Sequence, residues 1–411
     1  MNEIGFVSRR FLPAEGGVEH FLYDLVTALR QDYSPRMAAQ ILGDGPDFPG
    51  VDDVLARYYP DDEHRGLVIK ALAPSGLDRL RLLPCALKLL PGLRRVAYGP
   101  LKALAVRTFA RVYLRRLTAH FENVALIHSF AFDGPGLLGC RAAARLKVPF
   151  VITPFVHPGK WGDGAQNIAL YNAADAVLAL HAQDAEALKN LGVREELVRT
   201  CGVGINSFSG QGNRFREKHN IRGLMVLFIG RMIGHKGYRE LTRAAVRLRQ
   251  EGREITLVLI GPEGEHSEKF FKAHAGDGVL VLGQISDQEK NDALFACDLF
   301  CLPSKSEIMP MTILEAWWAG KPVLAGDIPA LRAFVDEGKD GLFVRQGTDA
   351  LREALLQFIT VPGHFRHLGE NGRKKVEEHY LIRHVAERTR DLYIEVMQRK
   401  KEVTRVTLSN T

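Results

Sequence analysis

The sequence lacks the marks of several protein classes. Its 411 residues contain no run of about 18 apolar side chains, and Met1 to Val7 shows no cationic segment followed by a long apolar one. We therefore expect no membrane span and no secretion signal. No Asp-x-Asp occurs and the five cysteines form no C-x-x-C pair, a pattern that does not favour a metal site. We interpret the cysteines as buried thiols in a reducing cytoplasm.

What is present fits a two-domain α/β enzyme. Hydrophobic residues make up 46% of the chain and charged residues 25%, without extreme bias. Short apolar strands alternate with helical patterns, which predicts parallel sheets joined by right-handed crossovers. A helical pattern runs from Ile382 to about Arg399, and the chain is expected to fray after Lys401. The predicted strands are residues 3–7, 37–42, 125–129, 150–153, 176–180, 224–229, 256–260, 279–282, 298–302, 322–325 and 341–344.

A helix that no side chain caps is predicted from Pro310 to Gly320. Proline suits the first helical position, which makes Met309 the N-cap. Because methionine cannot accept from the backbone amides of Met311 and Thr312, those donors remain for an anion, typically a phosphate. The sequence therefore predicts an anion site at this helix start.

Two glutamates flank that helix start. Glu307 lies in the preceding loop, and Glu315 lies over one turn into the helix. Glu315 can accept hydrogen bonds from the hydroxyls of a ribose, which leaves Glu307 to accept from a sugar. The alternative is that both are solvated side chains beside an ordinary helix.

A second candidate site follows the apolar strand Leu224 to Ile229. Gly230-Arg231 and then Lys236-Gly237 come directly after it. Cations at the carboxyl end of a parallel strand lie where open α/β sheets bind ligands, so Arg231 and Lys236 could clamp a diphosphate without a metal. The two glycines allow close backbone approach. The alternative is a pair of ordinary surface cations.

Together these residues resemble a known donor site. Gly230-Arg231 and Lys236-Gly237, followed by Glu307-x7-Glu315, are similar to the donor site of the retaining GT-B glycosyltransferases of family 4, glycosyl transferases group 1. The family often has glycine after its first glutamate, where this chain has Ile308. That departure bears on sugar specificity more than on activity.

The resemblance extends to further residues. Gly16 and Gly17 fall where the family has its acceptor-side glycine loop; by themselves they could let the backbone approach a phosphate or sugar, or form a plain turn. His157 follows a predicted strand at the position of a family histidine that faces the transferred sugar. It is therefore a better candidate for a site residue than His128. Ile285 falls where relatives hold the nucleobase largely through the backbone.

The resemblance implies a GT-B fold, with two Rossmann-like domains facing across a cleft. Residues 1–206 would form an acceptor-binding domain and 223–381 a donor-binding domain. Residues 207–222, polar and glycine-bearing, would link them. The last helix, 382–400, would cross back to the first domain.

The implied function is retaining transfer of a sugar from a nucleotide diphosphate sugar to a glycan or lipid-linked acceptor, in cell-envelope polysaccharide or glycolipid synthesis. Arg231, Lys236 and the amides near Met311 would stabilise the leaving diphosphate, while Glu307 orients the sugar and His157 holds it. No metal cofactor is expected. The alternatives are a sugar-nucleotide epimerase or hydrolase of the same architecture, and a non-catalytic membrane-associated partner.

The stretch 79–116 is basic, leucine-rich and free of acidic residues. Such a segment can lie on an anionic membrane, which would place the protein peripherally on the inner face of the cell membrane. The alternative is a helical insertion that packs its leucines on the core. The net charge of +7 agrees with an acidic partner. Nucleic acid is discounted because no recognisable binding module is present.

Overall fold

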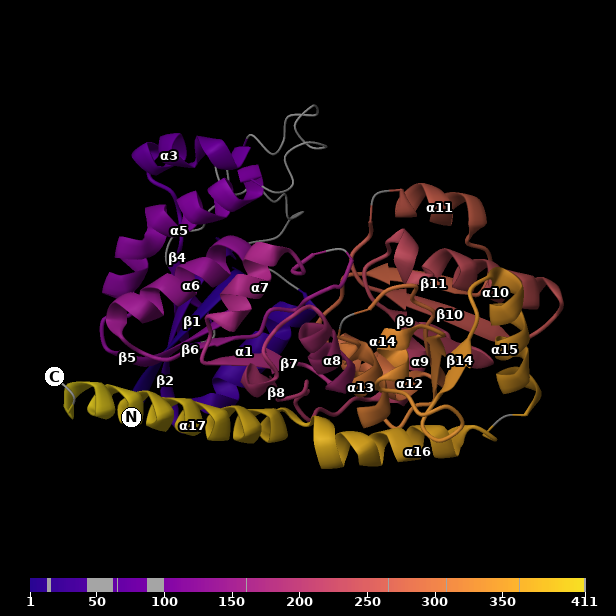
Figure 1. The fold of residues 1–411 in the computed structure, drawn as a ribbon. Helices are drawn as coiled ribbons and strands as arrows, with labels where there is room; N and C mark the ends of the chain where they lie inside the picture. Colours follow the sequence, from indigo (N-terminus) through magenta and orange to yellow (C-terminus); the bar gives the residue numbers. More distant parts are fainter. Residues whose placement is uncertain are drawn as a thin grey trace. The chain divides into compact units, whose positions relative to one another are not determined.

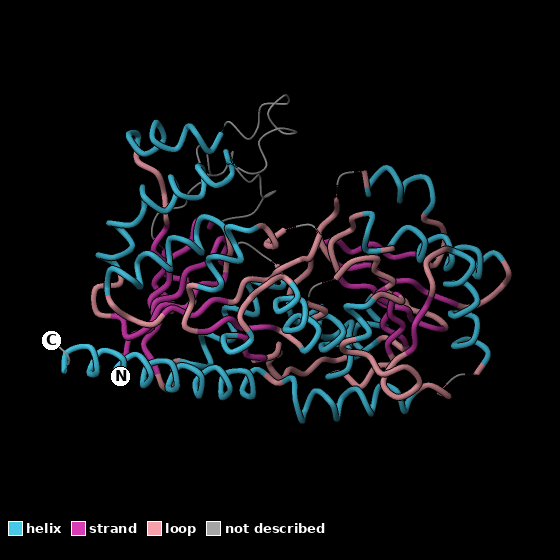
Figure 2. Tube along the Cα trace, viewed as in Figure 1, coloured by secondary structure: helices cyan, strands magenta, loops and turns pink. Residues whose placement is uncertain are grey.

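A computed structural model describes residues 1–12, 16–42, 62–64, 66–86, 100–159, 161–264, 266–307, 309–361 and 363–409. The chain forms two compact units (Figures 1 and 2). The first comprises Met1–Val203 together with Ile382–Thr411, and the second is Gly204–Leu381. Both are α/β units built on largely parallel sheets, so the predicted fold class is confirmed.

The first unit contains an eight-stranded sheet in the order β3-β4-β2-β1-β5-β6-β7-β8. Among the described strands of this sheet, β3 and β4 alone pair antiparallel. The sequence analysis missed β3, β4 and β8, of which β3 and β8 span only three residues each. The strands are β1 (Asn2–Phe11), β2 (Tyr33–Leu42), β3 (Asp62–His64), β4 (Leu67–Ala71), β5 (Val124–Phe130), β6 (Phe150–Ile152), β7 (Ala176–Ala179) and β8 (Val198–Thr200).

Alternating residues of β1 bury both faces of this sheet. Gly5 is needed on one face, because a Cβ there would lie 2.9 Å from the ring of Phe121 at the end of α5. Phe6 on the other face packs against His128 and Phe130. The helices of this unit are α1 (Gly17–Leu29), α3 (Gly76–Ala86), α5 (Pro100–His120), α6 (Asp133–Leu146), α7 (Ala165–Asn172), α8 (Ala182–Asn190) and α17 (Ile382–Ser409).

The last helix, α17, belongs to the first unit, as the predicted fold requires. It packs against α1 and β5. The hydroxyl of Tyr393 lies 2.6 Å from Nδ1 of the fully buried His128, whose Nε2 lies 2.8 Å from the Thr153 hydroxyl. The helix continues to Ser409, so the expected fraying after Lys401 is wrong. The reason is that residues 402–409 contain no glycine or proline that would end the helix.

The second unit contains a six-stranded parallel sheet in the order β11-β10-β9-β12-β13-β14. Counted from β9, this is the 3-2-1-4-5-6 order of doubly wound dinucleotide-binding folds. The strand order therefore reverses between β9 and β12, where such sheets bind their ligands. The strands are β9 (Leu224–Ile229), β10 (Ile255–Ile260), β11 (Val279–Gly283), β12 (Leu299–Leu302), β13 (Val323–Gly326) and β14 (Leu342–Val344).

Helices cover this sheet, with α10 beside α11 and α15, α12 beside α9, and α13 beside α16 (Figure 1). No helix in the described part of the chain is both long and apolar enough to cross a membrane. The helices are α9 (Gly212–Lys218), α10 (Tyr238–Gln250), α11 (Ser267–His274), α12 (Asp287–Ala296), α13 (Met311–Trp318), α14 (Pro329–Arg332), α15 (Thr348–Thr360) and α16 (Arg366–Lys375).

Residues 207–222 contain α9, which packs on α12 within the second unit. Gly212 is needed there, because a Cβ would meet the backbone of Phe295. Arg214 also forms an ion pair of 2.5 Å with the buried Asp292. The polar composition that predicted a linker thus belongs to a short docked helix.

The cysteines follow the prediction in part. Cys201, Cys297 and Cys301 are buried, but Cys140 is half-buried. Burial raises the pKa of Cys201 to about 11 and that of Cys297 to about 12, so both remain thiols at neutral pH.

Burial of His128 makes the stability of the first unit pH-dependent. Desolvation lowers the pKa of His128 to about 3, whereas an exposed histidine titrates near 6.5. The unfolded chain therefore binds a proton that the folded chain does not between these two pKa values. As pH falls through this window, we expect the free energy of unfolding to drop by about 1.4 kcal/mol per pH unit from this group alone. Urea unfolding at several pH values should show a shallower dependence for His128→Gln. Equal slopes would contradict the assignment.

Candidate functional site

The loops after β9 and β12 meet at the point where the strand order reverses. Nζ of Lys236 lies 2.6 Å from Oε1 of Glu307. The backbone amide of Lys305 donates to the carbonyl of His235 at 2.7 Å. The side chains of Lys236 and Glu307 are 17% and 6% exposed, so solvent screens this ion pair only in part. The structure thus joins two residues that lie 71 positions apart in the sequence.

Gly237 makes this close packing possible. Its φ is +75°, in the left-handed region, and a Cβ there would collide with the carbonyl oxygen of Pro303. Gly230 differs, because a Cβ there would make only an ordinary contact with the ring of Phe228, 3.5 Å away. The tight approach near Gly230 is made by Gly261, which packs on its backbone.

Helix α13 begins one residue later than predicted. Pro310, with φ −82° and ψ 59°, is the N-cap, and Met311 is the first helical residue. No side chain caps this end. The amide of Met311 donates to the carbonyl of Met309 at 2.9 Å, so the prediction that this amide is free is wrong. The local turn at Pro310 is the reason. The amide of Thr312 has no acceptor in the described part of the chain.

Glu315 in α13 has one oxygen that is paired and one that is not. Its Oε1 lies 2.9 Å from Nζ of Lys290 on α12. Its Oε2 is buried and has no hydrogen-bond partner among the described residues. A buried acceptor without a donor is costly, so this oxygen is suited to a ligand hydroxyl. The sequence analysis missed Lys290, which no local motif marks.

Three further side chains lie near the ends of these strands. Ser304, two residues after β12, is fully buried, and its hydroxyl has no partner among the described residues. Arg231 is exposed and forms no ion pair with any described residue. Ile285 is half-buried between β11 and α12. Ser304 was also missed, although its position directly after Pro303 at a strand end was a usable signal.

His157 lies in the first unit, after the carboxyl end of β6. Its backbone pairs with that of Trp161 through hydrogen bonds of 2.9 and 3.0 Å, and the two rings meet edge to face at 4.7 Å. The side chain is half-buried. Phe155, two residues earlier, is a buried residue with φ +50°. Such strained backbone occurs most often near functional sites, which suits a role for His157.

Gly16 and Gly17 lie at the start of α1. Gly16 is the N-cap and the helix begins at Gly17. The carboxylate of Glu19 folds back against Gly16 and pairs with Arg10 at 3.4 Å. Because this helix end already holds a negative charge of its own, it is less suited to a phosphate than the start of α13.

Two other histidines at strand ends, His128 and His181, have structural roles. His128 is buried in the network described above. His181 is the N-cap of α8 and accepts from the amide of Asp184. No group of three or more His, Cys, Asp or Glu side chains in the described residues is arranged to hold a metal ion.

Asp133 is a polar residue at the carboxyl end of β5 that the sequence analysis missed. It has φ +51°. Its carboxylate accepts from Asn167 at 3.0 Å and Gln166 at 3.3 Å, and it pairs with Lys102 at 3.1 Å. The signal was an aspartate three residues after a strand and directly before Gly134.

The chain is similar to known glycosyltransferases. Residues 211–375 match the family model of glycosyl transferases group 1. The chain is 28% identical over 328 residues to D-inositol 3-phosphate glycosyltransferase of Kribbella flavida, covering 68% of this chain and 76% of that protein. It is 26% identical over 290 residues to TuaC of Bacillus subtilis, named as a teichuronic acid biosynthesis glycosyltransferase, covering 68% and 69% of the two chains.

Solved structures show the same fold. Sucrose-phosphate synthase from Thermosynechococcus elongatus superposes with a TM-score of 0.70 at 19% identity, over 97% of this chain and 100% of that one. HepE of Anabaena, solved with UDP and glucose, gives 0.66 at 17% identity, over 95% and 99%. Residues 211–375 are therefore similar to the glycosyl transferases group 1 family, and the chain as a whole has the GT-B type of fold.

Proposed function

We propose that this protein transfers a sugar from a nucleotide diphosphate sugar to a glycan or lipid-linked acceptor, with retention of anomeric configuration and without a metal. The observation that carries the proposal is the Lys236–Glu307 pair at the reversal of strand order, beside a helix start whose Thr312 amide has no acceptor among the described residues. Cation, amide and carboxylate at that point suit a diphosphate joined to a hydroxyl-rich group.

The relatives support this class of substrate and pathway. HepE was solved with UDP-glucose, which is a nucleotide diphosphate sugar. TuaC is named for teichuronic acid biosynthesis, and a further relative, from Campylobacter jejuni, is named as acting on a diphospho-undecaprenol acceptor. Cell-envelope polysaccharide or glycolipid synthesis is therefore the proposed setting, with the protein peripheral on the inner face of the membrane.

In the proposed donor complex, Lys236 donates hydrogen bonds to both Glu307 and the diphosphate. Its ammonium group has three donors, so one can remain on Glu307 while the others reach the diphosphate. Arg231, which has no competing carboxylate among the described residues, adds a second cation, and the Thr312 amide adds a neutral donor. These groups bind most strongly as charge grows on the leaving phosphate, so they lower the barrier to transfer.

The two glutamates bind the uncharged parts of the donor. Oε2 of Glu315 accepts from a ribose hydroxyl, while Oε1 remains on Lys290. Glu307 accepts from a hydroxyl of the transferred sugar and fixes its orientation. Each glutamate is paired with a lysine. The lysine partly neutralises the carboxylate, which therefore repels the diphosphate less.

We propose the transfer step that the resemblance to retaining glycosyltransferases implies. The acceptor hydroxyl oxygen bonds to the anomeric carbon as the bond to the leaving phosphate oxygen breaks, and that phosphate oxygen takes the hydroxyl proton. Attack occurs on the face that the phosphate leaves, which retains the configuration. Glu307 positions the sugar and does not attack it. His157 would contact the sugar or the charge that develops near it.

The direct test is a screen of the purified chain against labelled UDP-, GDP- and ADP-sugars, with and without a polyprenyl-phosphate-linked glycan acceptor. We expect one nucleotide class to bind and its sugar to be transferred, with the product anomer matching the donor. Rapid release of free sugar or an epimerised donor without acceptor would instead indicate a hydrolase or an epimerase. Failure to bind any nucleotide sugar would contradict the proposal.

Removing the charge of Lys236 should abolish most transfer. We expect Lys236→Ala to reduce the transfer rate by about 10²-fold or more, the usual effect of losing one charge-stabilising donor. Lys236→Gln keeps a hydrogen bond to Glu307 and should lose a similar amount, which separates charge from folding. Lys272→Ala, which removes a solvent-exposed ion pair with Glu268, should leave the rate unchanged. Wild-type transfer by folded Lys236→Gln would rule out the diphosphate role.

The two glutamates should differ in what they bind. We expect Glu315→Gln to weaken binding of the free nucleotide diphosphate by about tenfold, because the amide is a poorer acceptor for ribose hydroxyls than a carboxylate. Glu307→Gln should leave that binding nearly unchanged and weaken only the intact sugar nucleotide. Calorimetric titration of both ligands measures the difference. Equal losses in the two variants would show that the division of roles is wrong.

A further inference from the structure

Helices α3 and α5 pack together on one side of the first unit (Figure 1). Their inner faces are apolar, with Leu82, Phe109, Tyr113 and Leu117 buried. Arg116 of α5 forms an ion pair of 2.6 Å with Asp78 of α3. We call the outer surface of these two helices the α3–α5 face. Residues 87–99, the remainder of the predicted basic stretch, lie outside the described residues and are not part of it.

The α3–α5 face exposes a row of leucines. Leu77, Leu80 and Leu83 of α3 are 68%, 65% and 52% exposed, and Leu104 of α5 is 47% exposed. Their spacing of three residues places the α3 leucines along one side of the helix, whereas Leu82 on the other side is fully buried. Four of the ten large exposed hydrophobic side chains of the described residues thus gather on two helices, which is more than scattered exposure.

Arginines border these leucines. Arg107, Arg111 and Arg115 are exposed and follow one another at intervals of four, so they form a row along α5. None of the three forms an ion pair with any described residue. Asp78 is the one acidic residue in the sequences of α3 and α5, and it is already paired with Arg116. The face is therefore both apolar and strongly basic.

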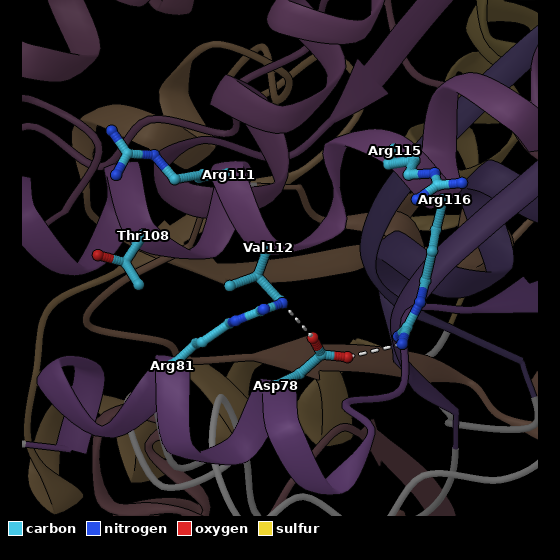
Figure 3. A pocket seen from close by; sticks show the side chains of 7 residues that line it. All are labelled: Asp78, Arg81, Thr108, Arg111, Val112, Arg115 and Arg116. Carbon is cyan, nitrogen blue, oxygen red and sulfur yellow. Dashed lines mark hydrogen bonds and ion pairs between the residues drawn. The ribbon is translucent and has the colours of Figure 1, made fainter.

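A cavity of about 630 Å³ opens on this face (Figure 3). Figure 3 shows Arg81 and Arg116 reaching Asp78 from opposite sides, and Arg111 extending from α5 beside Thr108. Four arginines and one aspartate leave three formal positive charges around the cavity. Guanidinium groups bind phosphate oxygens in pairs of hydrogen bonds, so a phosphate matches this lining better than a neutral ligand. The lining residues are Asp78, Arg81, Thr108, Arg111, Val112, Arg115 and Arg116.

We propose that the α3–α5 face docks on an anionic lipid bilayer, with the four exposed leucines entering the boundary of the acyl chains and the arginines of the cavity binding a headgroup phosphate. The exposed leucines and the arginine-lined cavity together favour a membrane over other anionic partners. A free phosphate would need the arginines but not the leucines, and an acidic protein would not require so many exposed leucines beside an arginine-lined cavity. The inference rests on the proposed function for the identity of the acceptor, but lipid binding does not require sugar transfer.

The test is co-sedimentation of the full chain with phosphatidylcholine vesicles that contain or lack phosphatidylglycerol. Each cation near an anionic surface contributes about fivefold to binding, so Arg107→Gln/Arg111→Gln/Arg115→Gln should weaken binding about 100-fold. The matched control is Arg239→Gln/Arg243→Gln/Arg247→Gln, which removes three arginines at the same spacing from α10 of the second unit. It lowers the net charge equally and should retain most binding.

The leucines are tested separately. Leu77→Ser/Leu80→Ser/Leu83→Ser should weaken binding about tenfold or more, and this loss should persist at high salt, where the arginine contribution is screened. Equal sedimentation of wild type and either α3–α5 variant would overturn the proposal. So would binding of inorganic phosphate, measured by calorimetry, without binding to anionic vesicles. Nucleotide diphosphate titration of the same samples separates failure of this proposal from failure of the donor site.

Discussion

The ion pair between Lys236 and Glu307 is the interaction on which the second unit's site depends. It forms because β9 and β12 are neighbours with opposite crossover directions, so the loops after their carboxyl ends meet. Gly237 permits the approach, since any larger residue would meet the carbonyl of Pro303. A mostly buried pair of this kind adds little net stability but is costly to break, which fixes both side chains in position before a ligand arrives. Rigid placement is what a charge-stabilising site requires.

A second lysine repeats the arrangement at Glu315, where Lys290 holds one oxygen and leaves the other without a donor. Within the described residues, the site thus combines neutralised carboxylates with an unpaired cation, Arg231, and an amide without an acceptor, that of Thr312. Positive groups face the expected diphosphate, while carboxylate oxygens remain for hydroxyls. In the first unit, the α3–α5 face combines unpaired arginines with exposed leucines. In the functions proposed above, positive charge would thus serve catalysis in one site and membrane attachment in the other.

Sequence reasoning recovered the features that local chemistry determines. The buried run Leu224–Ile229 appears as β9 with identical ends, because a glycine on each side bounds the continuous apolar stretch. The start of α13 was predicted one residue too early. The turn at Pro310 depends on the carbonyl of Met309 and not on helix propensity. Lys290 and Ser304 were missed because their importance arises only when distant segments meet. Helix α9 was read as linker because its stabilising contacts come from α12, far along the chain.

The central claim is that a nucleotide diphosphate sugar binds where the strand order of the second unit reverses. A crystal structure of the chain with the nucleotide diphosphate selected by the donor screen tests it most directly. The account predicts diphosphate oxygens within hydrogen-bonding distance of Lys236, Arg231 and the Thr312 amide, and a ribose hydroxyl donating to Oε2 of Glu315. A nucleotide bound at another edge of the sheet, with the Lys236–Glu307 pair untouched and Oε2 of Glu315 still without a donor, would contradict it.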